Sequence, residues 1–225
     1  MFKYETHMHT GDVSKCAQGS PAEMVKTYKN AGYAGIIVTN HFSLYDWNCP
    51  DGLSWAETVA FYMSGYEAAK RVGDLYGLDV FLGFEYNDEL NRDFLTYGLG
   101  ADFLMELGST KHKSIEEYSA MVRRGGGYLA QAHPFRDDKW SVYPYPAVPK
   151  MLDGVEVYNP GESSKNNGKA LAYAKRHNLP MQSGSDAHST KESYVSGILL
   201  RRRAKSIHDI IRAIKTGEAC CIIPG

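Results

Sequence analysis

The sequence predicts an α/β fold in which repeated strand–helix units close into a barrel. Apolar, β-rich runs alternate with helical patterns along the chain, which favours parallel strands joined by crossover helices. The length of 225 residues is normal for one α/β barrel, and no repeat or linker divides the chain, so a single domain over 1–225 is expected. A His, Asp or Glu follows several apolar runs, as expected at the rim where barrel strands end.

The first half of the chain is expected to supply three strands. In the first, around 4–10, His7 and His9 share one face because alternate side chains of a strand point the same way. Ser20, Pro21 and Glu23 have the pattern of a capped helix start, and that helix ends near Gly32. The remaining expected elements are a strand over 34–40 leading into His41, a loop over 42–52, a helix over 55–76 and a strand over 79–84 leading into Glu85.

The second half continues the alternation. The expected strands cover 94–99, 128–132 leading into His133, 154–158 followed by Asn159, 180–184 leading into Asp186 and His188, 197–200 and 219–223. The expected helices cover 114–124, 165–177 and 207–216. Seven or so such units in a chain of this length fit a closed barrel better than an open sheet.

Composition narrows the class of protein. Hydrophobic content of 43% and charged content of 23% are those of a soluble globular domain. The net charge of −1 gives no reason to expect nucleic acid or an anionic membrane, so nucleic acid is an unlikely partner. No apolar stretch is long enough to span a membrane, and the N-terminal run leaves no room for a signal peptide. Four cysteines without a C-x-x-C pattern indicate reduced thiols in a cytoplasmic protein.

Seven side chains that follow predicted strands would meet at one rim: His7, His9, His41, Glu85, His133, Asp186 and His188. Imidazole nitrogens combined with carboxylate oxygens suit Zn²⁺, Mn²⁺ or Fe²⁺ better than Ca²⁺ or Mg²⁺. Seven ligands exceed what one four-coordinate ion uses, so two or three divalent metals are expected, bridged by a carboxylate such as Glu85 or Asp186. Paired metals activate a water and stabilise the attacking and leaving oxygens at phosphorus, which indicates phosphate ester hydrolysis.

The ligands lie in five ordered motifs: His7-x-His9, Thr39-Asn40-His41, Gly83-Phe84-Glu85, Ala132-His133-Pro134 and Ser185-Asp186-Ala187-His188. With them the chain resembles the PHP superfamily, named for polymerase and histidinol phosphatase, over essentially its whole length. The resemblance implies a distorted seven-stranded, TIM-like (β/α) barrel with a trinuclear metal site. It implies three ligand groups: His7, His9, Glu85 and Asp186 for the first metal, Glu85 and His133 for the second, and His41 and His188 for the third.

The chain departs from the family pattern at three places. Many members carry an Asp or His where this chain has Cys16, whose thiolate ligates Zn²⁺ well; Asp12 is another candidate, and a free thiol is the alternative. Many members also have a His near Tyr97, a poorer ligand, which would weaken the second metal position. Asn40 replaces a usual Asp, so the groups behind the ligands carry less charge.

Other residues have both a functional and a structural interpretation. Arg136 either clamps a substrate phosphate, because guanidinium matches phosphate in a bidentate way, or forms a surface ion pair. Asn159 either contacts substrate or forms a turn. Loop aromatics either line a pocket or pack locally: Tyr45, Trp47, Trp140, Tyr143 and Tyr145.

The sequence as a whole predicts a stand-alone metal-dependent phosphoesterase that hydrolyses a small phosphomonoester, as histidinol phosphatase does. A metal-activated hydroxide would attack phosphorus with help from Arg136, and Asp186, His188 or a metal-bound water would protonate the leaving group. One alternative is a nuclease or nucleotidase acting on short oligonucleotides or nucleoside bisphosphates. The other is a non-catalytic metal-binding module.

Overall fold

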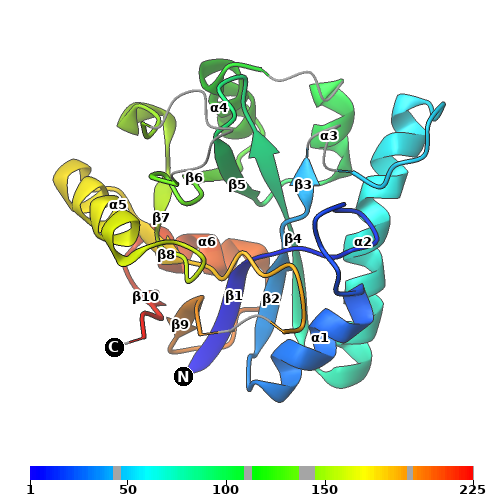
Figure 1. Cartoon of the computed structure of the whole chain (residues 1–225), viewed down its shortest axis with the longest axis horizontal. Helices are drawn as coiled ribbons and strands as arrows, with labels where there is room; N and C mark the ends of the chain where they lie inside the picture. Colours follow the sequence, from blue (N-terminus) through cyan, green and yellow to red (C-terminus); the bar gives the residue numbers. More distant parts are fainter. Residues whose placement is uncertain (43–46, 109–112, 137–144, 192–194, 225) are drawn as a thin grey trace.

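A computed structural model describes residues 1–42, 47–108, 113–136, 145–191 and 195–224 (Figure 1). Seven strands of its sheet form a ring: β1 (Phe2–Met8), β2 (Gly35–Val38), β4 (Asp79–Asn87), β5 (Asp93–Tyr97), β6 (Tyr128–Gln131), β7 (Gly154–Tyr158) and β8 (Met181–Ser183). β8 returns to β1, where Thr6 Oγ1 donates to Ser183 O at 2.8 Å and Met8 forms a parallel bridge with Ala187. The predicted distorted seven-stranded α/β barrel is confirmed.

The distortion of the ring lies in β5. Neighbouring ring strands pair in parallel, except that β5 is antiparallel to both β4 and β6. Only residues 88–92 join β4 to β5, and a connection this short permits a hairpin but not a crossover helix. The start of β5 therefore lies at the rim where the other strands end.

Three short strands lie outside the ring. β3 (His41–Phe42) pairs with β4, while β9 (Ile198–Leu200) joins β1 and pairs with β10 (Cys220–Cys221). The expected strand over 34–40 is shortened to β2, His41 and Phe42 form the separate β3 that was not expected, and the expected strand over 79–84 continues to Asn87. The bridge from β3 to β4 extends that rim beyond the end of β2.

The helices lie around the strands, with α1 (Pro21–Asn30) and α2 (Trp55–Tyr76) on one side and α5 (Ser164–His177) on the opposite side (Figure 1). The others are α3 (Ala101–Leu107), α4 (Ile115–Arg124), α6 (Ile207–Lys215) and the 3-10 turn η1 (Pro149–Met151). The predicted start of α1 is confirmed, because Ser20 and Glu23 form both hydrogen bonds of a capping box. α3 was not predicted; Gly100 gives it no side-chain cap, which removes the usual sequence signal. No helix in the described part of the chain is long and apolar enough to cross a membrane.

Candidate metal centre

The seven predicted ligands gather at one rim of the barrel. His7 lies in β1 and His9 just after it, His41 lies in β3, and His133, Asp186 and His188 follow β6 and β8. Glu85 lies within β4 rather than at its end, opposite His41 in the pairing with β3. The placement confirms the positional argument, because five strands deliver these side chains to the same place.

Glu85 is the centre of the group. Its Oε1 lies 3.0 Å from His7 Nε2 and 3.3 Å from His133 Nε2. Its Oε2 lies 2.7 Å from His41 Nδ1 and 3.3 Å from His9 Nε2. Both oxygens are shared among imidazoles that come from different strands, so this carboxylate is placed to bridge two metal ions.

Asp186, which follows β8, is the second carboxylate of the group. Its Oδ1 lies 3.3 Å from His7 Nε2 and 3.1 Å from His9 Nε2. Asp186 and His133 both have positive φ, +54° and +24°, a conformation that costs on the order of 1–3 kcal/mol for residues with a side chain. Strain of this kind at two ligands is typical of a functional site.

The donors fit divalent transition metals. Four groups of His, Asp and Glu place their ligand atoms within 4.8 Å of one another: His9, His41 and His188; His7, His9, Glu85 and Asp186; His7, His133 and Glu156; and Glu85, Asp93 and His133. Nε2 of His7 and Nδ1 of His9 are buried and make no hydrogen bond among the described residues, although Glu85 and Asp186 lie within 3.3 Å of His7 Nε2. Buried nitrogens without partners beside buried carboxylates leave a destabilised site that a cation would stabilise.

The pKa values of the two histidines also indicate that a cation would stabilise the site. Burial alone would lower the pKa of His7, but Asp186, Glu85 and Glu156 raise it well above the ordinary value. Burial and the neighbouring rings of His188 and His41 hold the pKa of His9 well below its ordinary value. His9 is therefore neutral, the state in which imidazole binds a metal.

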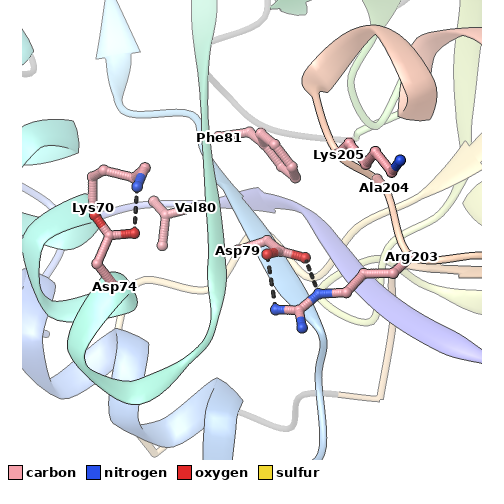
Figure 2. Close-up of a pocket in the computed structure, with 8 residues that line it drawn as sticks. All are labelled: Lys70, Asp74, Asp79, Val80, Phe81, Arg203, Ala204 and Lys205. Atoms are coloured by element: carbon pink, nitrogen blue, oxygen red, sulfur yellow. Dashed lines mark hydrogen bonds and ion pairs between the residues drawn. The ribbon is translucent and has the colours of Figure 1, made fainter.

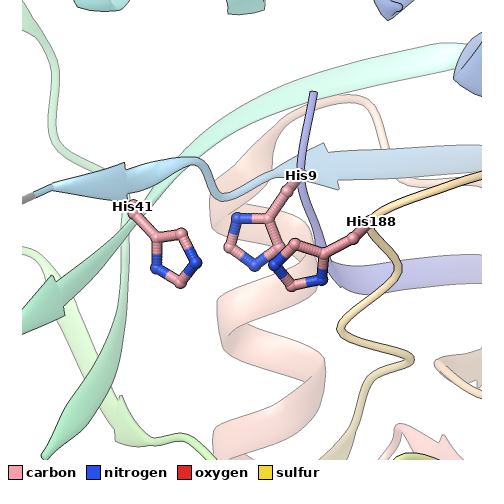
Figure 3. A group of neighbouring side chains, drawn as sticks. All are labelled: His9, His41 and His188. Atoms are coloured by element: carbon pink, nitrogen blue, oxygen red, sulfur yellow. The ribbon is translucent and has the colours of Figure 1, made fainter. Parts of the chain in front are cut away.

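Cys16 reaches the same rim from the loop after β1. Its thiol hydrogen-bonds to His188 and His41, two of the rings shown in Figure 3. Burial raises the pKa of the thiol, but these two hydrogen bonds more than offset it and bring the pKa to about 7. Cys16 thus lies beside two of the ligands expected for the third metal, but it is exposed and, like Asp12, belongs to none of the groups of possible ligands found in the described residues.

Two acidic residues of the site were missed from the sequence. Glu156 Oε1 lies 3.0 Å from His7 Nδ1, and its Oε2 accepts from the backbone N–H of His133 at 2.9 Å. Asp93 Oδ2 lies 3.9 Å from His133 Nε2. The available signals were a charged residue inside the apolar run 154–158 and, for Asp93, the hairpin that brings the start of β5 to the rim.

The expectation that Tyr97 takes the place of a family His as a poorer ligand beside the second metal is wrong. Because β5 is antiparallel, Tyr97 at its end lies away from the rim, and its hydroxyl donates to Thr6 O at 2.8 Å and accepts from Gln182. Asn40 supports the loop that carries Cys16: its Oδ1 accepts from Thr10 N at 2.7 Å and from the Ser14 hydroxyl.

Of the residues that had both a functional and a structural interpretation, Arg136 lies at the site, whereas Asn159 and Trp47 have structural roles. Arg136 donates to Glu162 at 2.8 Å and to Asp186, so it lies at the metal centre. Asn159 accepts from Gly161 N at 2.9 Å, which matches the turn-forming interpretation. Trp47 is buried and donates to His41 O, which is local packing, and Tyr145 is exposed. Three of the aromatics lie outside the described residues: Tyr45, Trp140 and Tyr143.

A separate hollow of ≈ 410 Å³ lies near the start of β4, away from Glu85 (Figure 2). Its charged side chains are largely paired, Arg203 with Asp79 and Lys70 with Asp74. Little unpaired charge is left there for a ligand.

Comparisons with known proteins agree with the fold. A family described as PHP-associated matches residues 164–219. No curated protein matches the chain in sequence. The structure is similar to a two-domain protein from Bacteroides vulgatus containing a predicted PHP-like metal-dependent phosphoesterase, with TM-score 0.74 and 15% identity over 98% of this chain. This chain spans 64% of that protein's length, less than two thirds.

Two other solved structures are informative. One is a protein from Bifidobacterium adolescentis proposed to be a metal-dependent phosphoesterase, with TM-score 0.63 and 15% identity over 95% of both chains. The other is the lesion-specific endonuclease Q of Pyrococcus furiosus, with TM-score 0.65 and 15% identity over 99% of this chain and 58% of that one.

The net charge of −1 led to the prediction that nucleic acid is an unlikely partner, and this prediction is wrong. Endonuclease Q has this fold, and it has been seen with a 27-mer duplex substrate whose abasic lesion lies at the active site. Net charge averages over the whole surface, whereas a substrate responds to the local field at the site. The PHP-associated match over 164–219, which includes α5 and α6, and the fold shared with a protein containing a predicted PHP-like phosphoesterase agree with the resemblance to the PHP superfamily that the ordered ligand motifs indicate.

Proposed function

We propose that the protein is a metal-dependent phosphoesterase. The observation that carries the proposal is the buried group around Glu85, which holds four imidazoles within 3.3 Å of one carboxylate at the rim of the barrel. Divalent metals bound there would lower the pKa of water and neutralise charge on the phosphoryl oxygens. A structural site would need only one closed ligand set, whereas the described residues here offer four sets, two of which share Glu85.

The protein's own residues would hold and orient the phosphate ester. Arg136 lies between Asp186 and Glu162 with its side chain 31% exposed, so part of its guanidinium faces the solvent from which substrate arrives. Burial lowers and Asp186 raises the pKa of Arg136, and the net effect is a raised pKa that keeps it charged. A permanent cation beside the metals suits a phosphate oxygen.

Asp186 and His188 act as ligands in this proposal. Burial raises the pKa of Asp186, but His7, His9 and Arg136 bring it well below the ordinary value, so the carboxyl stays ionised. His188 lies in the group with His9 and His41. An ionised Asp186 carries no proton to give, so in this proposal the proton for the leaving group comes from water.

The substrate is a phosphate ester, either a small phosphomonoester or a phosphodiester in a nucleic acid. The likeness to endonuclease Q favours including the second class. The test is a panel of sugar and amino-alcohol phosphates, nucleoside bisphosphates, short oligonucleotides and a duplex with an abasic site, each assayed with Mn²⁺ and with Zn²⁺. Release of phosphate or strand cleavage that Glu85→Gln abolishes would support the proposal.

Two results of the same panel would contradict the proposal. Retention of metal by the wild-type protein without turnover on any member of the panel would identify a non-catalytic metal-binding module. Turnover that is unchanged in Glu85→Gln would place the reaction elsewhere in the molecule.

A further inference from the structure

Arg136 lies between two carboxylates that contact different parts of its guanidinium group. Its Nε donates to Glu162 Oε1 at 2.8 Å, and its Nη2 donates to Asp186 Oδ2. These bonds use two of the five N–H groups of the arginine, and Nη1 donates to no acceptor among the described residues. The edge formed by Nη1 and Nη2 is therefore the part of Arg136 that can bind a phosphate.

Glu162 is held in place from the start of α5. Its Oε2 accepts from Nδ2 of Asn166, a buried residue in the first turn of that helix, at 3.1 Å. The loop before α5 is closed by other bonds, because Glu162 N donates to Asn159 O at 3.0 Å and Asn167 Nδ2 donates to the same oxygen at 2.9 Å. The carboxylate of Glu162 is thus not needed to close the loop, and Arg136 is its ion-pair partner.

The contact with Glu162 changes how Arg136 meets Asp186. Arginine and a carboxylate often form a forked pair, in which two N–H groups contact both oxygens. Here Glu162 holds Nε, so Asp186 accepts from Nη2 through Oδ2 alone. Its Oδ1 stays 3.3 Å from His7 Nε2 and 3.1 Å from His9 Nε2. Without Glu162, a forked pair would draw both oxygens of Asp186 to the guanidinium.

We propose that Glu162 is a positioning residue that prevents a forked pair between Arg136 and Asp186. By holding Nε, it keeps Asp186 Oδ1 for a metal ion and the Nη1–Nη2 edge for a substrate phosphate. The inference rests on the proposed metal-dependent phosphoesterase function. It adds the residue that divides Arg136 between a metal ligand and the substrate.

The first readout is the affinity for Zn²⁺, measured by competition with a chelator, which does not depend on activity. Glu162→Ala releases Nε, and this loss of a charge-assisted hydrogen bond should weaken Zn²⁺ binding by about tenfold. Glu162→Gln keeps an acceptor oxygen for Nε, so its affinity should stay within about twofold of the wild type. Glu116→Ala removes an exposed glutamate of α4 and is the matched control, which should bind as the wild type does.

A second substitution distinguishes positioning from a general effect of charge. Lysine cannot form a forked pair, so adding Glu162→Ala to Arg136→Lys should weaken Zn²⁺ binding by no more than about twofold. The second readout is inhibition of turnover by inorganic phosphate, which reports on the Nη1–Nη2 edge. Its inhibition constant should rise about tenfold in Glu162→Ala and stay near the wild-type value in Glu162→Gln. Glu162→Ser, which is also too short to reach Nε, repeats both measurements if the alanine variant does not fold.

Three results would overturn the inference while leaving the metal centre in place. They are wild-type affinity for Zn²⁺ in folded Glu162→Ala, equal losses in Glu162→Ala and Glu162→Gln, or a tenfold loss that persists in the Arg136→Lys background. Failure of the wild-type protein to retain any transition metal would instead overturn the proposed function, and this inference with it.

Discussion

Glu156→Gln tests how the barrel interior orients the metal ligands. Glu156 uses one oxygen to accept from His7 Nδ1 at 3.0 Å and the other to accept from His133 N at 2.9 Å and Asn159 Nδ2 at 3.2 Å. Glutamine has the same shape but only one acceptor oxygen, and its NH₂ group only donates. The variant can therefore satisfy His133 and Asn159, or His7, but not all three.

The substitution Glu156→Gln would change which ring nitrogen of His7 carries the proton. If the amide oxygen stays with His133 and Asn159, the NH₂ group faces His7 Nδ1 and favours the tautomer with its proton on Nε2. Nε2 is the atom 3.0 Å from Glu85, so the proton would occupy the position that the metal needs. Loss of a carboxylate behind a histidine ligand typically lowers metal affinity 10–100-fold, which corresponds to about 1.4–2.7 kcal/mol.

The assay is competition between the protein and a chelator of known affinity for Zn²⁺ and Mn²⁺. Glu106→Gln is the matched control, because Glu106 forms an exposed ion pair with Arg124 and lies outside the ligand groups of the described residues. The control should bind metal as the wild type does. Wild-type affinity in a folded Glu156→Gln protein would refute the argument that this carboxylate fixes the tautomer of His7.

His9→Ala and Glu85→Ala should each abolish phosphoesterase turnover while the circular dichroism spectrum stays that of the wild type. Arg136→Lys keeps one charge but not the fork that reaches Asp186 and Glu162, and the loss of a charge-assisted hydrogen bond of about 1.5 kcal/mol should lower kcat/KM by about tenfold or more. Burial raises the pKa of Glu5 from 4.5 to about 7, so the folded protein keeps a proton that the unfolded chain loses. In chelator-treated protein, denaturant titrations should therefore show that raising pH from 4.5 to 7 costs the wild type about 3 kcal/mol of unfolding free energy relative to Glu5→Gln.

The sequence predicted the residues that local chemistry determines. The capping box at Ser20 and the left-handed end of α2 at Gly77, with φ +66°, have signals within a few residues of the chain. The pair His7 and His9 was recognisable because the period of a strand places both on one face. The separate elements could be joined into one centre because strand ends of a barrel share a rim.

The sequence misplaced Tyr97 and missed Asp93 because it does not show the direction of β5. A chain that alternates strand and helix suggests parallel strands throughout, and under that assumption the end of the strand at 94–99 would lie at the rim. The structure reverses β5, which removes Tyr97 from the centre and brings Asp93 into it. The deciding feature is the short connection over 88–92, where Asp88 Oδ1 accepts from the backbone of Leu90 and Arg92.

The buried carboxylate of Glu5 lowers the stability of the folded protein, and this loss of stability is an argument about function. Glu5 accepts three backbone N–H groups through one oxygen, from Thr6, His7 and Ser185, and so ties the strand that carries His7 to the turn before Asp186. Its other oxygen is buried without a partner in the described residues. An unpaired buried carboxylate oxygen costs free energy that no other contact of Glu5 recovers. A buried carboxylate that holds two ligand-bearing turns in register is explained if the spacing of those ligands matters more than the stability it costs.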